Sequence, residues 1–168
     1  MNLKLQPGDL AKEGLPLAGL LKKVASDFPD WRAVSACGEF DLTYPLLQEL
    51  VDQAAALVAA YGISAGDVVV LAFPNTVEFV ILFPAVIRCR VTAAPLNPNY
   101  TTKEFKFYLS DSEPKLLLTP QEGNRWAQSA ASKLNIHHPT AKLHSTDSKI
   151  TLFDRCRAEP WLNVQSCQ

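Results

Sequence analysis

Glycine is scarce in this sequence of 168 residues, and the few glycines form no nucleotide-binding motif. Seven glycines occur, and no two of them are separated by a single residue. The dinucleotide-binding fingerprint G-x-G-x-x-G needs such a pair, because its tight turn and its close approach to a pyrophosphate depend on it. The phosphate-binding loop G-x-x-x-x-G-K needs a lysine directly after its second glycine. Neither motif is present, so the sequence offers neither type of phosphate site.

Paired cysteines and an excess of one charge are also lacking. Sixteen lysines and arginines against 17 aspartates and glutamates give a net charge of -1, so no field attracts nucleic acid or an anionic membrane. The four cysteines contain no C-x-x-C pair, and the three histidines are not spaced as their partners, so we expect no metal site. Residues 1–14 carry no basic-then-apolar leader. We therefore expect reduced thiols, a cytoplasmic location, and neither nucleic acid nor membrane as a partner.

What is present suffices for one folded domain. Apolar residues make up 48% of the chain and charged residues 20%, which is enough to bury a core. Leucines and valines at helical spacing predict an amphipathic helix over residues 16–27, which Pro29 ends. Two short strands, 32–36 and 39–43, flank Cys37-Gly38 and predict a hairpin.

From Thr43 onward the pattern alternates between helices and strands. A helix with one apolar face runs to Tyr61, and Gly62 stands where a left-handed C-terminal cap is needed. A continuous apolar strand follows at 68–73. Thereafter the sequence predicts a helix from an Asn75/Glu78 capping signal to Arg88, a strand at 91–94, a helix from a Thr101/Glu104 cap, a strand at 115–119, a helix at 124–134 and a short strand at 141–143.

This alternation predicts an α/β fold with a parallel sheet and flanking helices, preceded by a helix and a β-hairpin. The alternative for residues 68–87 is a membrane span, because Glu78 is the only charge across that segment. Pro74-Asn75 in its centre favours a strand, a turn and a buried helix instead, since a turn in hydrocarbon leaves backbone groups unpaired.

Three polar residues follow the predicted parallel strands. Ligands of open parallel sheets gather beyond the carboxyl ends of the strands, so Asn75, Asn97 and Thr119 are candidate ligand contacts. Residues of these types also cap helices and shape turns, and this second interpretation is favoured because nothing charged or nucleophilic accompanies them. We therefore assign no catalytic residue.

Other reactive side chains also have simpler explanations. Adjacent His137 and His138 are typical of a polar loop, because neighbouring residues rarely face one site. Residues 110–112, Ser-Asp-Ser, indicate a helix end rather than a nucleophile. Arg88 and Arg90 on either side of Cys89 would lower the pKa of its thiol, but a solvated helix end is the simpler interpretation.

Several segments, in order and in spacing, resemble the opening part of the adenylate-forming acyl-CoA synthetase superfamily over residues 15–152. Residues 42–47, Leu-Thr-Tyr-Pro-Leu-Leu, resemble its first core motif, and residues 66–79 resemble its G-D-x-V and P-N-x-x-E-F stretch. Residues 85–98 resemble the second core motif, although many relatives have Ala-Gly-Ala where this chain has Cys89-Arg90-Val91. Within the superfamily the wording of residues 17–21, 28–30 and 109–112 is most similar to plant oxalate:CoA ligases, with 4-coumarate:CoA ligases as the alternative.

The resemblance implies an incomplete N-terminal subdomain of an acid:CoA ligase that uses ATP, magnesium and coenzyme A. The family's later motifs are not in this sequence: the Ser/Thr/Gly-rich phosphate loop with its lysine, the acidic ribose-binding motif, the hinge and the C-terminal lysine. Those groups stabilise charge on the transferring phosphoryl oxygens. We therefore expect no cofactor in this chain, no turnover by it alone, and a small carboxylic acid as a partner only where the missing parts are supplied.

The resemblance also divides the chain into three parts. Residues 1–14 form a leader, 15–152 a partial synthetase domain, and 153–168 a tail outside the family pattern. A truncated product or an incomplete gene model would explain this division. The alternatives to an inactive ligase segment are an interaction protein that associates with a full-length synthetase, and a product too unstable to accumulate, because a sheet cut from a larger domain leaves apolar faces uncovered.

Overall fold

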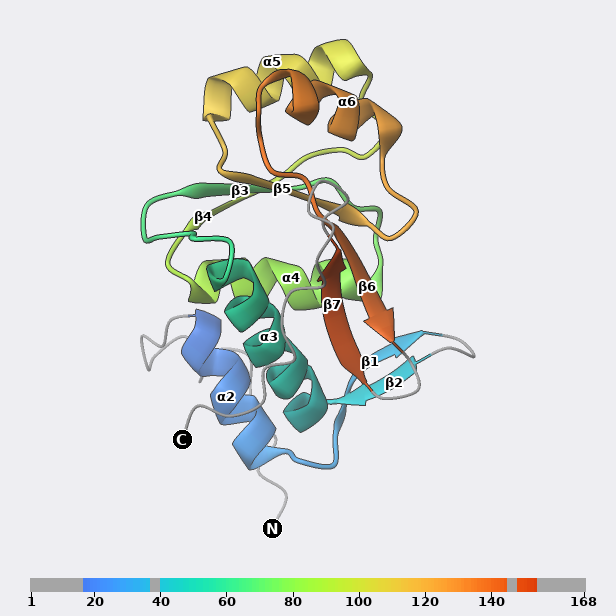
Figure 1. The fold of residues 1–168 in the computed structure, drawn as a ribbon. Coiled ribbons are helices and arrows are strands. Elements are labelled where there is room, and N and C mark those ends of the chain that lie inside the picture. The colour runs from blue at the N-terminus through green and yellow to red at the C-terminus, as the bar shows by residue number, and fades with distance from the viewer. Residues whose placement is uncertain (1–16, 37–39, 145–147, 154–168) are drawn as a thin grey trace.

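The computed structural model describes residues 17–36, 40–144 and 148–153, which form five helices and seven strands (Figure 1). In chain order the elements are α2 (Leu17–Asp27), β1 (Arg32–Ala36), β2 (Phe40–Thr43), α3 (Tyr44–Ala59), β3 (Val68–Leu71), α4 (Val77–Arg88), β4 (Thr92–Pro95), α5 (Thr102–Ser112), β5 (Leu116–Pro120), α6 (Arg125–Lys133), β6 (Thr140–His144) and β7 (Lys149–Phe153).

The centre of the fold is a five-stranded sheet with the order β4-β3-β5-β6-β7. Strands β3, β4, β5 and β6 pair in parallel, and β7 is antiparallel to β6. In the centre, Val70 lies between Ala94 of β4 and Leu117 of β5. The predicted α/β fold with parallel pairing is therefore confirmed, and so is the hairpin, since β1 and β2 form a separate antiparallel pair. The turn predicted at Cys37-Gly38 lies outside the described residues.

Helices cover both faces of β3, β4 and β5 (Figure 1). Helices α5 and α6 lie on one side, and α4, with α3 and α2 beyond it, lies on the other. Strand β3 sends alternate side chains into these two layers: Val69 and Leu71 join the core with α3 and α4, whereas Val70 joins the core with α5 and α6. Covering on both faces explains why this strand is a continuous apolar run.

Local capping signals account for the starts of three helices. The hydroxyl of Thr43 accepts a hydrogen bond from the amide of Leu46 at the start of α3. Thr101 and Glu104 form a reciprocal capping box at the start of α5, and its hydrogen bonds hold the pKa of Glu104 below the usual value. Asn124 caps α6. These helices lie where the sequence predicts them, and Gly62, just after α3, has the predicted left-handed backbone, with φ of +73°.

The capping signal predicted at Asn75 is wrong. Helix α4 begins at Val77 with Thr76 at the N-cap, and no side chain caps it. The carboxylate of Glu78, which a capping box would turn back to the helix start, accepts a hydrogen bond from the amide of Leu143 in β6 at 3.4 Å. This tertiary contact engages the carboxylate that a capping box at the start of α4 would need. The helix itself ends at Arg88, as predicted.

Strand β7 is the element that sequence reasoning missed. It pairs with the full length of β6, from Thr140 opposite Phe153 to His144 opposite Lys149. The predicted short strand at 141–143 is confirmed within β6. Residues 154–168 of the predicted tail, and the predicted leader 1–14, lie outside the described part of the chain.

The segment 68–87, which resembles a membrane span by composition, is divided between β3 and α4, with Pro74-Asn75 between them. Helix α4 has 12 residues. Within the described residues, no helix has both the length and the apolar character needed to cross a bilayer.

Candidate functional site

The carboxyl edge of the sheet is the place where a ligand of this fold is expected. Strand β3 lies between β4 and β5, and the chain leaves β3 toward one neighbour and later returns to the other. The helix after β3, α4, covers one face, whereas the helix after β5, α6, covers the opposite face. Strands β3 and β5 thus form a topological switch point, the position at which open α/β sheets bind ligands.

The structure places all three candidate residues at this edge but does not join them. Asn75 follows β3, Asn97 follows β4, and Thr119 lies near the end of β5. Both asparagines are exposed, whereas Thr119 is completely buried. Among the described residues, no hydrogen bond links any two of the three.

The two neighbouring loops are instead connected by Asn124, which sequence reasoning treated only as a helix start. Its side-chain amide donates to the carbonyl of Pro98 at 2.7 Å, and its side-chain oxygen accepts from the amide of Ala127 at 3.1 Å. Asn97 shapes the same loop, since its side-chain oxygen accepts from the amide of Asn99 at 3.0 Å. The turn-shaping interpretation therefore accounts for the side-chain contact of Asn97.

Thr119 is the unusual member of this edge. Its hydroxyl has no hydrogen-bond partner among the described residues, although the side chain is fully buried. The hydroxyl of Thr76, at the start of α4, is also buried without a partner. Buried polar atoms nearly always have a partner, so these two hydroxyls are exceptions within the described part of the chain.

A substitution at Thr119 tests this. We expect Thr119→Val, which keeps the shape and removes the hydroxyl, to raise the free energy of unfolding by about 1–2 kcal/mol, because a buried unpaired polar atom costs that much. Urea unfolding measures the change. Thr119→Ser, which keeps the hydroxyl, is the control and should bring no gain. A destabilising Thr119→Val would mean that the hydroxyl has a partner in solution.

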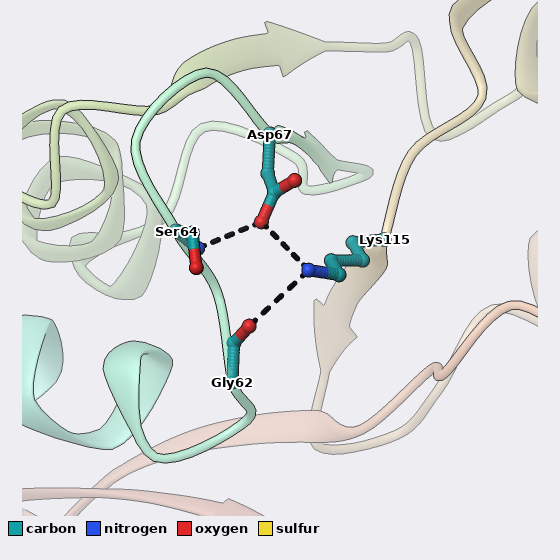
Figure 2. Close-up of polar contacts among 4 residues, drawn as sticks. All are labelled: Gly62, Ser64, Asp67 and Lys115. Carbon is teal, nitrogen blue, oxygen red and sulfur yellow. Dashed lines mark hydrogen bonds and ion pairs between the residues drawn. The ribbon is translucent and has the colours of Figure 1, made fainter.

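The opposite, amino edge of the same strands carries a connected polar cluster (Figure 2). The carboxylate of Asp67, just before β3, accepts from the amide of Ser64 at 2.7 Å and from the ammonium of Lys115 at 3.0 Å. Lys115, just before β5, also donates to the carbonyl of Gly62 at 3.3 Å. This cluster joins the two central strands at their starts, and every group in it is engaged within the fold, so its role is structural.

These contacts make the stability of the fold depend on pH in the acidic range. The amide of Ser64, and next the Lys115 ammonium, hold the pKa of Asp67 below its usual value of 3.8. A carboxyl pKa that is lower in the folded than in the unfolded state stabilises the fold at every pH above the unfolded-state pKa. This stabilisation is lost as the pH falls through the folded-state pKa. We expect Asp67→Asn to flatten the fall in stability below about pH 4, measured by urea unfolding across pH. Asp111→Asn, on an exposed helix surface, is the control and should not change the profile.

The other reactive side chains do not converge. The imidazole Nε2 of His138 lies 2.9 Å from the hydroxyl of Ser132, whereas the backbone carbonyl of its neighbour His137 accepts from the amide of Leu117 in β5. Ser112 donates to the carbonyl of Tyr108 in the last turn of α5. No three His, Cys, Asp or Glu side chains gather as a metal site in the part of the chain that the structure describes.

Cys89 is not an activated thiol. Burial raises the pKa of its thiol, and the charge of Arg88 offsets only part of that shift. Its sulfur lies 3.4 Å from the carbonyl of Ala55 in α3, and Arg88 pairs with Asp52 of the same helix. The interpretation of this segment as a helix end is confirmed, since Cys89 is the C-cap of α4.

Comparison with known proteins decides the family. Residues 21–165 match the family described as AMP-binding enzyme, which is well over half of the chain. The chain belongs to the AMP-binding enzyme family. It is 60% identical over 137 residues to the oxalate–CoA ligase of Arabidopsis thaliana, covering 81% of this chain and 27% of that protein. It is 58% identical over 138 residues to a probable CoA ligase, CCL9, of Humulus lupulus, covering 82% of this chain and 26% of that protein. The chain thus spans about a quarter of the length of these relatives.

Solved structures of a CoA synthetase and a putative CoA ligase share the fold. A fatty acyl CoA synthetase of Mycobacterium tuberculosis aligns with a TM-score of 0.61 and 28% identity over 70% of this chain and 23% of its own. A putative long-chain-fatty-acid CoA ligase of Rhodopseudomonas palustris aligns with a TM-score of 0.69 and 22% identity over 75% of this chain and 32% of its own. The resemblance read from the sequence motifs is therefore confirmed.

The backbone at Arg90 bears on one departure from the family motifs noted in the sequence. Arg90 stands where many relatives have glycine, and its φ of +61° is in the left-handed region that favours glycine. The backbone is held there because the Arg90 amide donates to Ile87 and the Arg90 carbonyl accepts from Gly66. A non-glycine side chain therefore occupies a backbone conformation that strains it.

Relief of this strain is measurable. We expect Arg90→Gly to stabilise the chain by about 0.5–1 kcal/mol, because the left-handed backbone costs a non-glycine residue about 1–2 kcal/mol and the freedom of glycine in the unfolded chain offsets part of the gain. Thermal unfolding checks it. Arg90→Ala removes the charge but keeps the Cβ atom, so it should give no gain, and an equal gain from alanine would assign the effect to the charge instead.

The three candidate residues at the carboxyl edge do not form one cluster among the described residues. Asn75 and Asn97 are exposed and unconnected, and the Thr119 hydroxyl is sealed inside the fold.

Proposed function

We propose that these 168 residues form the N-terminal segment of an ATP-dependent acid:CoA ligase that acts on oxalate. The observation that carries the proposal is the 60% identity to an oxalate–CoA ligase over 81% of this chain. The order and spacing of the family motifs support it, and the shared fold supports membership of the ligase class. The alternative substrate is 4-coumarate, because the sequence motifs also resemble those of 4-coumarate:CoA ligases. A cytoplasmic location belongs to the same proposal.

We also propose that the segment alone does not catalyse the reaction. The sequence contains neither the phosphate loop nor the C-terminal lysine that the family uses with ATP, magnesium and coenzyme A. Adenylation places charge on the transferring phosphoryl oxygens, and preorganised donors have to stabilise that charge. The carboxyl edge described above offers two exposed amides and one sealed hydroxyl. A small carboxylic acid would become a partner only in a protein that supplies the remaining motifs.

The experiment begins with the protein in its source. An antibody against residues 15–122 captures it, and intact mass with peptide mapping gives its length. A longer protein is then assayed for thioester formation with oxalate, malonate and 4-coumarate, and we expect oxalate to be preferred. Thioester formation with another acid but not with oxalate would overturn the substrate. The purified 168-residue chain is assayed for oxalate-dependent pyrophosphate exchange, and exchange above a mock preparation would overturn the inactivity.

A second candidate is an interaction protein that associates with a full-length synthetase. The observation that favours it is a set of exposed large apolar side chains among the described residues, including Phe107 of α5, which is 65% exposed, and Trp126 of α6, which is 46% exposed. Co-purification of a native synthetase with this chain would support association. A monodisperse monomer that retains no synthetase would count against it.

A further inference from the structure

An open cavity of about 580 Å³ lies in the layer formed by α5 and α6. Each of these helices leads from the carboxyl end of one parallel strand to the amino end of the next, so both end at the amino edge of the sheet. The end of α5, the residues after α6 and the residues that lead into β5 line the cavity. It therefore lies at the opposite edge from Asn75, Asn97 and Thr119, and its volume is within the ~300–1,000 Å³ of sites for small molecules.

The cavity has an apolar floor and a polar rim. The floor consists of buried or half-buried apolar side chains from both helix ends, namely Leu109, Pro114, Leu134 and Ile136. The rim carries the exposed side chains of Ser110, Glu113 and Asn135. Sites that bind small molecules combine an apolar lining with a few polar groups that fix the orientation of the ligand. This composition fits a molecule with an apolar body and one polar end.

The end of α5 gives the rim a negative polarity. Glu113, with φ of +44°, ends the helix and places its carboxylate at the cavity. The next residue, Pro114, has no amide hydrogen to donate to the carbonyl of Ser110, and the amide of Lys115 donates to the carbonyl of Val68 at 3.0 Å. The last carbonyls of a helix carry a partial negative charge, which attracts a cation. The carboxylate and the helix end therefore favour a positively charged group at the same place.

The one lysine that lines the cavity does not cancel this polarity. The ammonium of Lys115 lies 3.0 Å from the carboxylate of Asp67 and 3.3 Å from the carbonyl of Gly62, so its charge is paired outside the cavity (Figure 2). Lys133, in the last turn of α6, is not among the lining residues. The remaining lining residue, His137, brings an imidazole, which can donate or accept a hydrogen bond.

We propose that this cavity binds a small organic ammonium ion with an apolar body. The apolar body lies on the floor of the cavity, and the ammonium group donates to the carboxylate of Glu113 and to the last carbonyls of α5. An ammonium group has three donors and no acceptor, so it matches a rim made of oxygen acceptors. The proposal does not rest on the proposed function, because the lining residues lie at the amino edge, away from the carboxyl edge of the sheet.

Three probes with the same apolar chain and different charge test the proposal. Hexylamine, which is protonated at neutral pH, is titrated into the ¹⁵N-labelled 168-residue chain, and amide chemical shifts report where it binds. We expect saturable shifts at Ser110, Glu113, Asn135 and Ile136, with a dissociation constant of about 1 mM for so small a probe. Hexanol and hexanoate, which are neutral and negative, should bind about fivefold and about tenfold more weakly, because they lose the attraction to the rim.

Removal of one carboxylate completes the test. Glu113→Gln keeps the shape of the side chain and removes its charge, and we expect it to weaken the binding of hexylamine about fivefold without changing that of hexanol. Glu122→Gln is the matched control, because it removes the same charge from an exposed residue at the carboxyl edge of the same layer. It should leave both affinities unchanged.

Four results would overturn the ammonium site. They are shifts that do not saturate, saturable shifts confined to residues away from the cavity, equal affinity for the three probes, and an unchanged affinity for hexylamine in Glu113→Gln. Equal affinity would show that the cavity accepts apolar molecules whatever their charge. The comparison of the three probes uses the unmodified chain, so it decides the question even where a substitution disturbs the fold. None of these results bears on oxalate, whose thioester is assayed separately.

Discussion

Phe105→Ala is expected to lower the free energy of unfolding by about 3–5 kcal/mol, which is a large part of the stability of a domain of this size. Phe105 is completely buried between α5, α6 and the sheet, and it is among the largest fully buried side chains of the described residues. Its neighbours in this layer include three alanines of α6, namely Ala127, Ala130 and Ala131. The short side chains of these alanines cannot fill the space that the Phe105 ring leaves. The cavity should therefore persist, and the loss of stability should lie at the upper end of the range.

Phe107→Ala provides the matched control two residues along the same helix. Its ring is 65% exposed, so the same change of side chain should alter stability by no more than about 0.5 kcal/mol. Both variants are compared by urea unfolding, with the slope of the transition checked for a change in cooperativity. Equal effects at the two positions would contradict the placement of Phe105 in the core.

The framework of the fold could be predicted because it depends on local signals. The alternation of apolar strands with amphipathic helices gave β3, α4, β4, α5, β5, α6 and β6 in order, and their spacing gave parallel pairing. Caps such as Thr101 with Glu104 depend on residues three apart, so the sequence contains all of their parts.

The predictions failed where residues that are distant in the sequence determine the local structure. Glu78 has the right spacing for a cap, but the amide of Leu143, 65 residues away, takes its carboxylate. Strand β7 has only five residues, too few for a firm prediction from their alternation, and its position depends on pairing with β6. In both places the competing tertiary contact is invisible to a short sequence window.

The sequence predicted the sheet edge at which the candidate residues lie, but not which side chains contact one another there. Parallel topology places Asn75, Asn97 and Thr119 at one edge, as the sequence implied. Whether a hydroxyl there is sealed without a partner depends on the packing of α5 and α6, which no spacing encodes. The Asp67–Lys115 pair joins residues 48 apart, and the only sequence signal for it is the Gly66-Asp67 turn that opens β3.

Leu50→Ala should have a comparable effect in the other layer, with a loss of about 2–5 kcal/mol. Leu50 is completely buried on α3, and its layer also contains Leu82 of α4 and Ile150 of β7. The cavity would lie between α3, α4 and β7, the last strand of the sheet. The substitution therefore tests whether α3 and β7 are parts of one core.

Leu57→Ala on the same helix is the graded control. Leu57 is only partly buried against the same core, so its truncation should cost about 1 kcal/mol. Hydrogen exchange after Leu50→Ala separates two arrangements of the fold. Because β3 contributes side chains to both layers, we expect amides of β3 and α5 to lose protection together with those of α3. Loss confined to α3 and β7 would show that the α5–α6 layer unfolds independently, in which case Phe105→Ala and Leu50→Ala would weaken separate units.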